Sequence, residues 1–294
     1  MKINVKKIVE EKSAKIKSFI KEVDEEVTVC IIQVEGNYGS DIYVRNKVKK
    51  LESLGINVKL HKLPENCTKE QLNISIIFNG GSQFIDGILL QLPLPDHLKE
   101  YEQEFIDLIP ERKDIDRLTT TAQGMIALGN IDLLPCTVQG IIDIINNTYE
   151  GNAYHEREFL IFGRSKLVGM PLSIALTHLG GTVKTIHTKS PKIGTEDRIY
   201  DEEADVVISA VGIEDFINLE ILKRYYASYE GTFIDVGINR NKEGKVCGDI
   251  SNTHVFEDSA WTDYTTVPGG VGPTTVLNVA YNTLKLVYGN EVKF

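Results

Sequence analysis

The sequence predicts an α/β protein with parallel sheets. Two nearly continuous apolar runs, Val27–Val34 and Phe159–Phe162, have the composition of strands that are covered on both faces. Glycine and then helical apolar spacing follow each run, which is the strand, turn and helix order of a parallel sheet. At 294 residues the chain is long enough for two domains, each with its own core.

Composition and charge indicate which kind of binding partner to expect. Hydrophobic residues make up 42% and charged residues 25% of the chain, so disorder is not expected. The formal net charge of −10 argues against nucleic acid or an anionic membrane as the main partner and favours a small molecule. No stretch has the apolar length of a membrane span, and Met1–Phe19 resembles neither a signal peptide nor a transit peptide. We therefore expect a cytoplasmic protein.

The cysteines fit that compartment. Cys30, Cys67, Cys136 and Cys247 are far apart in the sequence and form no C-x-x-C pair. This spacing indicates neither a zinc site nor a disulfide framework, so reduced thiols and no bound metal are expected.

The first half of the chain alternates predicted helices and strands. A helix is expected over Ile8–Val23, before the first apolar strand. Ser40 or Asp41 is predicted to cap the next helix, and Gly55 to end it. Ile56–Leu60 then alternates apolar and polar residues as the following strand.

Tyr43 and Lys47 lie four residues apart on this second helix. They therefore project from one face, where the phenol and the ammonium group form a candidate catalytic pair. In the alternative, Tyr43 packs in the core and Lys47 extends into solvent.

The run DGILLQLPLP, Asp86–Pro95, is the most distinctive stretch of the first half. A buried strand would not ordinarily carry Gln91, and the prolines beyond it stop the hydrogen-bond ladder, so Gln91 is predicted at the carboxyl end of the strand. Ligands of open α/β sheets bind at such ends. The alternative is a glutamine that satisfies backbone groups of the loop.

Pro110–Asp116 places two carboxylates in a predicted loop. A carboxylate accepts two parallel hydrogen bonds, which suits a ligand with adjacent N–H and amino groups, such as a pterin ring. In the alternative, Asp114 and Asp116 pair with the basic residues of the same solvated turn.

In the second half, Gly163 follows the apolar run and helical spacing resumes from Val168. Strand, tight turn and helix in this order are typical of a dinucleotide-binding turn, because glycine permits close backbone approach and the positive end of the helix faces the pyrophosphate. Gly163 and Gly169 do not complete the G-x-G-x-x-G pattern, so an ordinary strand-to-helix connection is the alternative.

The next strand, Thr182–His187, is followed by Thr188, Lys189 and Ser190. An NAD site usually has an acidic residue near this position. Hydroxyl groups and cations favour a 2′-phosphate instead, which indicates NADP, with Arg164 as a further donor.

Three later stretches bring glycine close to the predicted site. Two strands, Asp205–Gly212 and Gly231–Asn239, each end near glycine, where a cofactor can approach. Val267–Thr275 then contains three glycines and two prolines, which predicts a rigid turn able to pass close to a flat ligand before the last helix.

Together these motifs resemble the bifunctional methylenetetrahydrofolate dehydrogenase/methenyltetrahydrofolate cyclohydrolase family. The resemblance covers nearly the whole chain and rests on Tyr43 with Lys47, DGILLQLPLP from Asp86, KDID from Lys113, PCT from Pro135, GRSKLVGMP from Gly163, DVGIN from Asp235 and PGGVGPTT from Pro268. It implies two α/β domains with a folate-binding cleft between them, and a homodimer. Residues 1–138 and 273–294 would form the folate-binding catalytic domain, and residues 139–272 the Rossmann-like NADP-binding domain.

The implied activity is oxidation of 5,10-methylenetetrahydrofolate by NADP, followed by hydrolysis of the methenyl product to 10-formyltetrahydrofolate. The first step depends on alignment with the nicotinamide, because two nitrogens flank the reacting carbon and stabilise its cation. The second step moves protons, and the resemblance assigns its central role to Lys47. A lysine is a poor base at neutral pH, so its pKa must be lowered or its ammonium must orient the water.

The resemblance also implies the site residues. Its catalytic residues are Lys47, Gln91, which tunes Lys47, and Tyr43, which orients the folate ring. Its substrate-binding residues are Ser40, Tyr43, Asp116 at the pterin edge, and Gly270 and Pro273 beside the folate. Its cofactor-binding residues are Gly163, Arg164, Ser165, Thr188 and Ile238.

Three positions depart from the family pattern. Arg117 stands where glycine is common, Val138 where proline is common and Thr188 where serine is common. An arginine cannot adopt positive φ cheaply, so Arg117 is expected to disturb the loop that carries Asp116. Two alternatives stay open: a dehydrogenase without cyclohydrolase activity, against which the retained lysine and glutamine argue, and a folate- and nucleotide-binding protein with little turnover.

Overall fold

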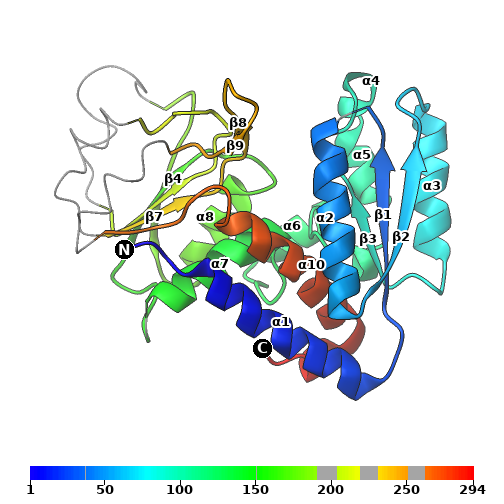
Figure 1. Ribbon diagram of the computed structural model, residues 1–294, viewed down its shortest axis with the longest axis horizontal. Helices are drawn as coiled ribbons and strands as arrows, with labels where there is room; N and C mark the ends of the chain where they lie inside the picture. Colours follow the sequence, from blue (N-terminus) through cyan, green and yellow to red (C-terminus); the bar gives the residue numbers. More distant parts are fainter. Residues whose placement is uncertain (37, 150, 191–203, 219–230, 251–261) are drawn as a thin grey trace. The chain divides into compact units, whose positions relative to one another are not determined.

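The computed structural model has two compact units, each built around a parallel sheet (Figure 1). It describes residues 1–36, 38–149, 151–190, 204–218, 231–250 and 262–294, and of residues 38–40 only the backbone. Unit 1 comprises Met1–Val9 and Thr137–Thr275, and unit 2 comprises Glu10–Cys136 and Val276–Phe294. The α/β class predicted from the apolar runs is confirmed.

The sheet of unit 2 has three parallel strands in the order β2-β1-β3. These strands are β1 (Thr28–Val34), β2 (Asn57–Leu63) and β3 (Gly87–Leu90). They lie between α2 (Tyr38–Leu54) on one side and α3 (Lys69–Gly81) on the other (Figure 1). The smaller helices of the unit are α4 (Asp96–Lys99), α5 (Glu102–Asp107), the 3₁₀ helix η1 (Glu111–Lys113), α6 (Thr120–Ala127) and the 3₁₀ helix η3 (Gly289–Glu291).

The core of unit 2 explains the apolar run of its first strand. All but the first residue of β1 are buried, and all four residues of β3 are buried, because helices cover both faces of the sheet. Thr68 forms a capping box with Gln71 at the start of α3, and Gly55 follows α2 with a φ of +98°.

The predicted cap of α2 is wrong. The helix begins at Tyr38, so Ser40 and Asp41 lie in its first turn rather than at its N-cap. The side chain of Asp41 accepts a hydrogen bond of 2.7 Å from Nε2 of Gln33 on β1, and this contact ties the first turn of the helix to the sheet.

The sheet of unit 1 has five parallel strands in the order β10-β7-β6-β4-β5. The strands are β4 (Glu158–Phe162), β5 (Thr182–Ile186), β6 (Val206–Ser209), β7 (Gly231–Asp235) and β10 (Thr262–Tyr264). Helix α8 (Gly169–His178) follows β4, and β8 (Asn239–Arg240) pairs with β9 (Val246–Cys247) as a short antiparallel ribbon. Order and direction of the strands place the carboxyl ends of β4, β6 and β7 side by side.

Three helices contribute residues to both units: α1 (Val5–Val23), α7 (Cys136–Thr148) and α10 (Val271–Tyr288). The units differ from the sequence-derived domain bounds mainly at the N-terminus, where Met1–Val9 belongs to unit 1. Lys2 forms a parallel bridge to Tyr264, so the start of the chain pairs with β10.

Cys30, Cys67 and Cys136 are buried free thiols, and Cys247 is a half-buried one. In the part of the chain that the structure describes, no group of three or more His, Cys, Asp and Glu residues is arranged to hold a metal ion. None of the helices described has the length and apolar character needed to cross a membrane.

Candidate active site

Lys47 and Gln91 meet at the end of strand β3. Gln91 directly follows this strand, and its backbone N–H donates to the carbonyl of Ile32 on β1 at 2.8 Å. Its side chain is 9% exposed, and Oε1 accepts a hydrogen bond of 2.9 Å from Nζ of Lys47. The amide nitrogen of the same side chain donates to the carbonyl of Leu92. The predicted place of Gln91 is confirmed, and its contact with the loop backbone uses only the amide nitrogen.

Asp116 and Cys136 lie near enough to the same lysine to influence its pKa. Burial lowers the pKa of Lys47, and the negative charge of Asp116 opposes this shift. Oδ1 of Asp116 accepts a hydrogen bond of 3.3 Å from the backbone N–H of Cys136. Burial raises the pKa of the Cys136 thiol well above its ordinary value, and Asp116 adds to that shift. Cys136 is therefore a neutral thiol, and Asp116 is the charge that faces Lys47.

Tyr43 lies one helical turn before Lys47 on α2 and is half-buried. The i, i+4 spacing predicted for the pair is therefore confirmed, and it directs both side chains to one face of the helix. Lys47 is also half-buried rather than extended into solvent. The side chain of Ser40 lies outside the described residues.

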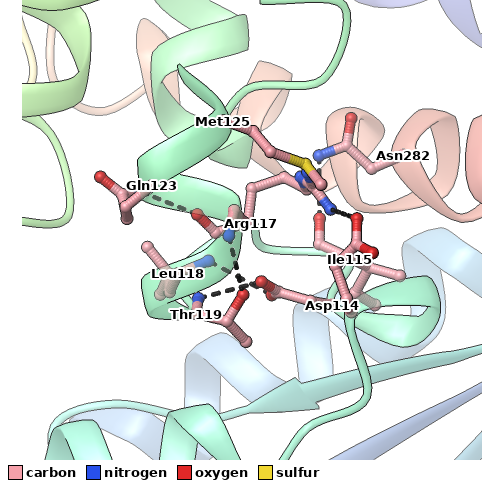
Figure 2. A network of polar contacts seen from close by, with 10 residues as sticks. Asp114, Ile115, Arg117, Leu118, Thr119, Gln123, Met125 and Asn282 are labelled. Carbon is pink, nitrogen blue, oxygen red and sulfur yellow. Dashed lines mark hydrogen bonds and ion pairs between the residues drawn. The ribbon is translucent and has the colours of Figure 1, made fainter. Parts of the chain in front are cut away.

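The loop that carries Asp116 is closed by Asp114 (Figure 2). The carboxylate of Asp114 is 1% exposed and accepts backbone hydrogen bonds from Leu118 at 3.2 Å and Thr119 at 2.9 Å. Burial raises the pKa of Asp114, and these hydrogen bonds oppose the shift. The predicted alternative of a solvated turn is therefore wrong for Asp114.

Arg117 adopts the backbone conformation that was expected to be costly, with a φ of +56°. Its side chain is only 4% exposed and lies beside Met125, to whose sulfur Nη2 donates at 3.5 Å (Figure 2). Nη1 lies 3.6 Å from a carboxylate oxygen of Glu111. Among the described residues, Nε and Nη1 of Arg117 have no hydrogen-bond partner. The loop thus holds an arginine in a glycine-like conformation while Asp116 still bonds to Cys136.

Asn282 on α10 is a residue of this region that the sequence did not reveal. Figure 2 shows Asn282 above Ile115. Its Nδ2 donates to the carbonyls of Ile115 at 2.8 Å and Leu134 at 2.9 Å. It therefore ties the segments that lead into Asp116 and Cys136 to the C-terminal helix. Its partners lie 148 and 167 residues away in sequence, so no local pattern could have indicated it.

The predicted dinucleotide turn lies in unit 1, between β4 and α8. Gly163 has a φ of +110°, and a Cβ at this position would overlap the carbonyl of Ala210 beyond β6. A Cβ at Gly169 would overlap the carbonyl of Gly163. Both glycines are therefore required by close packing of strand and helix, which is one use of glycine in dinucleotide turns. Ser165 closes the turn, with its hydroxyl accepting from the N–H of Val168 at 3.2 Å.

Arg164 and Thr188 follow two neighbouring strands. Phe162 pairs with Ile186 in the register of β4 and β5, so the residues after each strand emerge at the same edge of the sheet. Both Arg164 and Thr188 are exposed there. His187 stabilises the turn after β5, because its Nδ1 accepts from the N–H of Lys189 at 3.1 Å.

The remaining predicted residues also belong to unit 1. Ile238 is 48% exposed and lies between β7 and β8. Gly270 is buried and precedes α10, and a Cβ there would lie 2.8 Å from the carbonyl of Thr266. Pro273 is exposed in the first turn of α10, where a missing N–H is tolerated.

Two family models match the chain. Residues 135–291 match the NAD(P)-binding domain of tetrahydrofolate dehydrogenase/cyclohydrolase, and residues 3–116 match its catalytic domain. The chain belongs to the tetrahydrofolate dehydrogenase/cyclohydrolase family. The resemblance stated from the motifs is confirmed.

Individual members of the tetrahydrofolate dehydrogenase/cyclohydrolase family are similar over most of their length. The bifunctional protein FolD of Lysinibacillus sphaericus is 36% identical over 258 residues, which cover 87% of this chain and 85% of the relative. The bifunctional protein FolD of Listeria innocua is 33% identical over 286 residues, or 96% of this chain and 95% of the relative. The crystal structure of the bifunctional 5,10-methylenetetrahydrofolate dehydrogenase/cyclohydrolase from Thermoplasma acidophilum superposes with a TM-score of 0.83 at 31% identity, over 100% of both chains.

Proposed function

We propose that the protein oxidises 5,10-methylenetetrahydrofolate with NADP and hydrolyses the methenyl product to 10-formyltetrahydrofolate, as part of one-carbon metabolism. The observation that carries this proposal is the hydrogen bond of 2.9 Å between Lys47 and Gln91 beside Asp116, in a chain that both family models match. The dehydrogenase-only alternative offers no reason for a half-buried lysine with a lowered pKa at this position.

In the hydrolytic step, Lys47 takes the proton from the attacking water. Its pKa is lowered by burial, so a larger fraction of the amine is neutral near pH 7 than for an exposed lysine. Gln91 orients the amine through a neutral acceptor, which leaves the pKa low. Asp116 keeps one oxygen on the N–H of Cys136 and accepts from the pterin edge with its carboxylate. Tyr43 orients the ring from the same face of α2.

The turn after β4 fits a dinucleotide. Its two glycines let the backbone approach closely, and the turn leads into the N-terminus of α8, whose positive end attracts a phosphate. Gly163 and Ser165 would lie at the pyrophosphate, Arg164 and Thr188 would bind the 2′-phosphate, and Ile238 would be a further contact. When bound, the dinucleotide accepts the hydride of the first step.

The proposal extends to the larger organisation of the protein. Residues 1–138 and 273–294 form the folate-binding domain, and residues 139–272 form the NADP-binding domain. Gly270 and Pro273 lie beside the folate, and Ser40 lies at the substrate site. The protein is a homodimer in the cytoplasm, in keeping with its free cysteines and the family resemblance.

An absorbance assay tests the function. Purified protein receives 5,10-methylenetetrahydrofolate and NADP, and NADPH and the methenyl intermediate are followed separately. We expect NADPH with little methenyl accumulation, and hydrolysis of added methenyl substrate above its spontaneous rate. Accumulating methenyl product would identify a dehydrogenase alone, and absence of NADPH would identify a binding protein.

The variant Lys47→Met tests which of the two reaction steps needs Lys47. It should abolish hydrolysis while hydride transfer stays measurable, because the first step needs alignment rather than a base. Lys49→Met is the matched control, since Lys49 is exposed on the same helix. Equal loss of both activities in Lys47→Met would contradict the division of roles.

A further inference from the structure

Two buried aspartates lie together in unit 1, and the mechanism above uses neither of them. Asp235 ends β7 and is 1% exposed, and Asp249 follows β9 and is fully buried. Buried carboxylates are costly unless hydrogen bonds compensate for the lost water. The hydrogen bonds of the two carboxylates therefore show which segments of the chain these aspartates stabilise.

The carboxylate of Asp249 accepts five hydrogen bonds from described residues. The donors are the backbone N–H groups of Val211, Gly212 and Ile213, the hydroxyl of Ser209 and the side-chain amide of Asn239, at 2.9 to 3.3 Å. Three consecutive N–H groups on one carboxylate fix the path of the chain after β6. The bond to Asn239 ties that path to the segment that follows β7.

Asp235 fixes Asp249 in turn. Its carboxylate accepts from the backbone N–H groups of Gly237 at 3.1 Å, Asp249 at 3.0 Å and Ile250 at 3.0 Å. Glycine lets the backbone pass close to each carboxylate. A Cβ at Gly237 would overlap the carboxylate of Asp249, and a Cβ at Gly248 would overlap the carboxylate of Asp235. The two carboxylates thus connect three segments of unit 1.

These segments lie at the carboxyl edge of the sheet, where open α/β sheets bind ligands. Strand β6 lies between β4 and β7, and the N–H of Ala210 donates to the carbonyl of Phe162 at 2.8 Å, directly beside the glycine turn. The loop after β7 carries Ile238, which is exposed. Gly212 has a φ of +69° and open space where a Cβ would be.

We propose that Asp249 is a positioning residue of the cofactor site, which sets the loops after β6 and β7 against which the dinucleotide binds. It touches neither substrate nor cofactor. This inference rests on the dinucleotide binding proposed above, and it adds the residue that holds the binding surface in place.

The variant Asp249→Asn tests this role, because it keeps the shape of the side chain and changes its chemistry. The three backbone N–H groups around the carboxylate can only donate, so the amide nitrogen of asparagine would face at least one N–H group that cannot accept its hydrogen. The dissociation constant of NADPH, measured by fluorescence titration, and the KM for NADP should both rise at least roughly tenfold, as expected when buried donors lose their partner. Hydrolysis of methenyl substrate, which uses no dinucleotide, should be unchanged.

Asp205→Asn is the matched control in the same unit. Asp205 accepts from the backbone N–H of Glu158 at 2.7 Å, at the amino ends of β4 and β6 and therefore away from the proposed site. The NADPH affinity of the Asp205→Asn variant should equal that of the unaltered protein. An Asp249→Asn protein with unchanged NADPH affinity, or one that loses hydrolysis in proportion, would overturn the proposal.

Asn239→Ala is the second variant, which keeps the proposal testable if Asp249→Asn does not fold. It removes only the link between the two loops and should weaken NADPH binding severalfold while hydrolysis persists. Unchanged NADPH affinity in Asn239→Ala would then overturn the proposal. Failure of the unaltered protein to bind NADPH would overturn the proposed function and this inference together, whereas normal binding by a variant would overturn only the inference.

Discussion

Nζ of Lys47 donates a hydrogen bond of 2.9 Å to Oε1 of Gln91, a neutral acceptor at the end of a buried strand. A carboxylate at this position would stabilise the ammonium form and raise the pKa of the lysine. The amide orients the amine without that effect. The pair therefore combines a fixed direction for the amine with the low pKa that burial produces.

The first prediction concerns Gln91→Glu. The new carboxylate would lie beside the amine and raise the pKa of Lys47, so hydrolysis at pH 7 should fall by about tenfold. In a pH profile of kcat with methenyl substrate, the limb that reports Lys47 should move to higher pH. Gln91→Leu is the control, because it also removes the amide that donates to Leu92 but adds no charge. A Gln91→Glu profile that coincides with that of Gln91→Leu would show that charge at this position does not control Lys47.

The second prediction concerns Asp116→Asn, which should move the same limb in the opposite direction. The charge of Asp116 raises the pKa of Lys47 against the effect of burial, so its removal lowers that pKa further. The kcat limb should therefore shift to lower pH, and the KM for folate should rise because a pterin partner is lost. The pH dependence of kcat and the KM for folate are measured separately. A rise in KM without a shift in the pH dependence of kcat would therefore assign Asp116 to substrate binding alone.

Sequence reasoning succeeded where the signal was local. A glutamine before two prolines indicates the end of a strand from neighbouring residues alone, and the structure places Gln91 there. It failed at Ser40 and Asp41, because the start of α2 depends on a contact between Asp41 and β1 that no local cap rule contains. It also missed Asp249, whose donors other than Asn239 lie 36 to 40 residues earlier in the chain.

The third prediction concerns cofactor choice and Arg164→Ala. Arg164 and Thr188 emerge at the same edge of the sheet, and a 2′-phosphate there would gain a charge-assisted hydrogen bond from the guanidinium. The KM for NADP should rise by roughly tenfold, while the KM for NAD changes little. Lys2→Ala is a control of the same charge, because Lys2 pairs with β10 at the opposite edge of this sheet. Faster turnover with NAD than with NADP in the unaltered protein would contradict the phosphate assignment.

The side chain of Arg117 is an unfavourable feature of the Asp116 loop. Its guanidinium is 4% exposed with Nε and Nη1 unbonded among the described residues, and its ionic partner Glu111 is 3.6 Å away and largely open to water. A buried cation with unmet donors costs more than such a contact returns. We therefore expect desolvation of the side chain to cost more stability than its charge interactions with Glu111 and the buried Asp114 return, apart from any cost of its positive φ.

The fourth prediction is that Arg117→Met stabilises the protein by about 1 kcal/mol, measured as the free energy of unfolding in urea. Methionine keeps most of the buried stem, packs against Met125 and leaves Glu111 free to hydrate. The backbone φ stays positive, so the comparison isolates the guanidinium. Arg112→Met is the control, since Arg112 is exposed in the same turn and should change little. A loss of stability in Arg117→Met alone would mean that the ion pair with Glu111 outweighs the desolvation of the guanidinium.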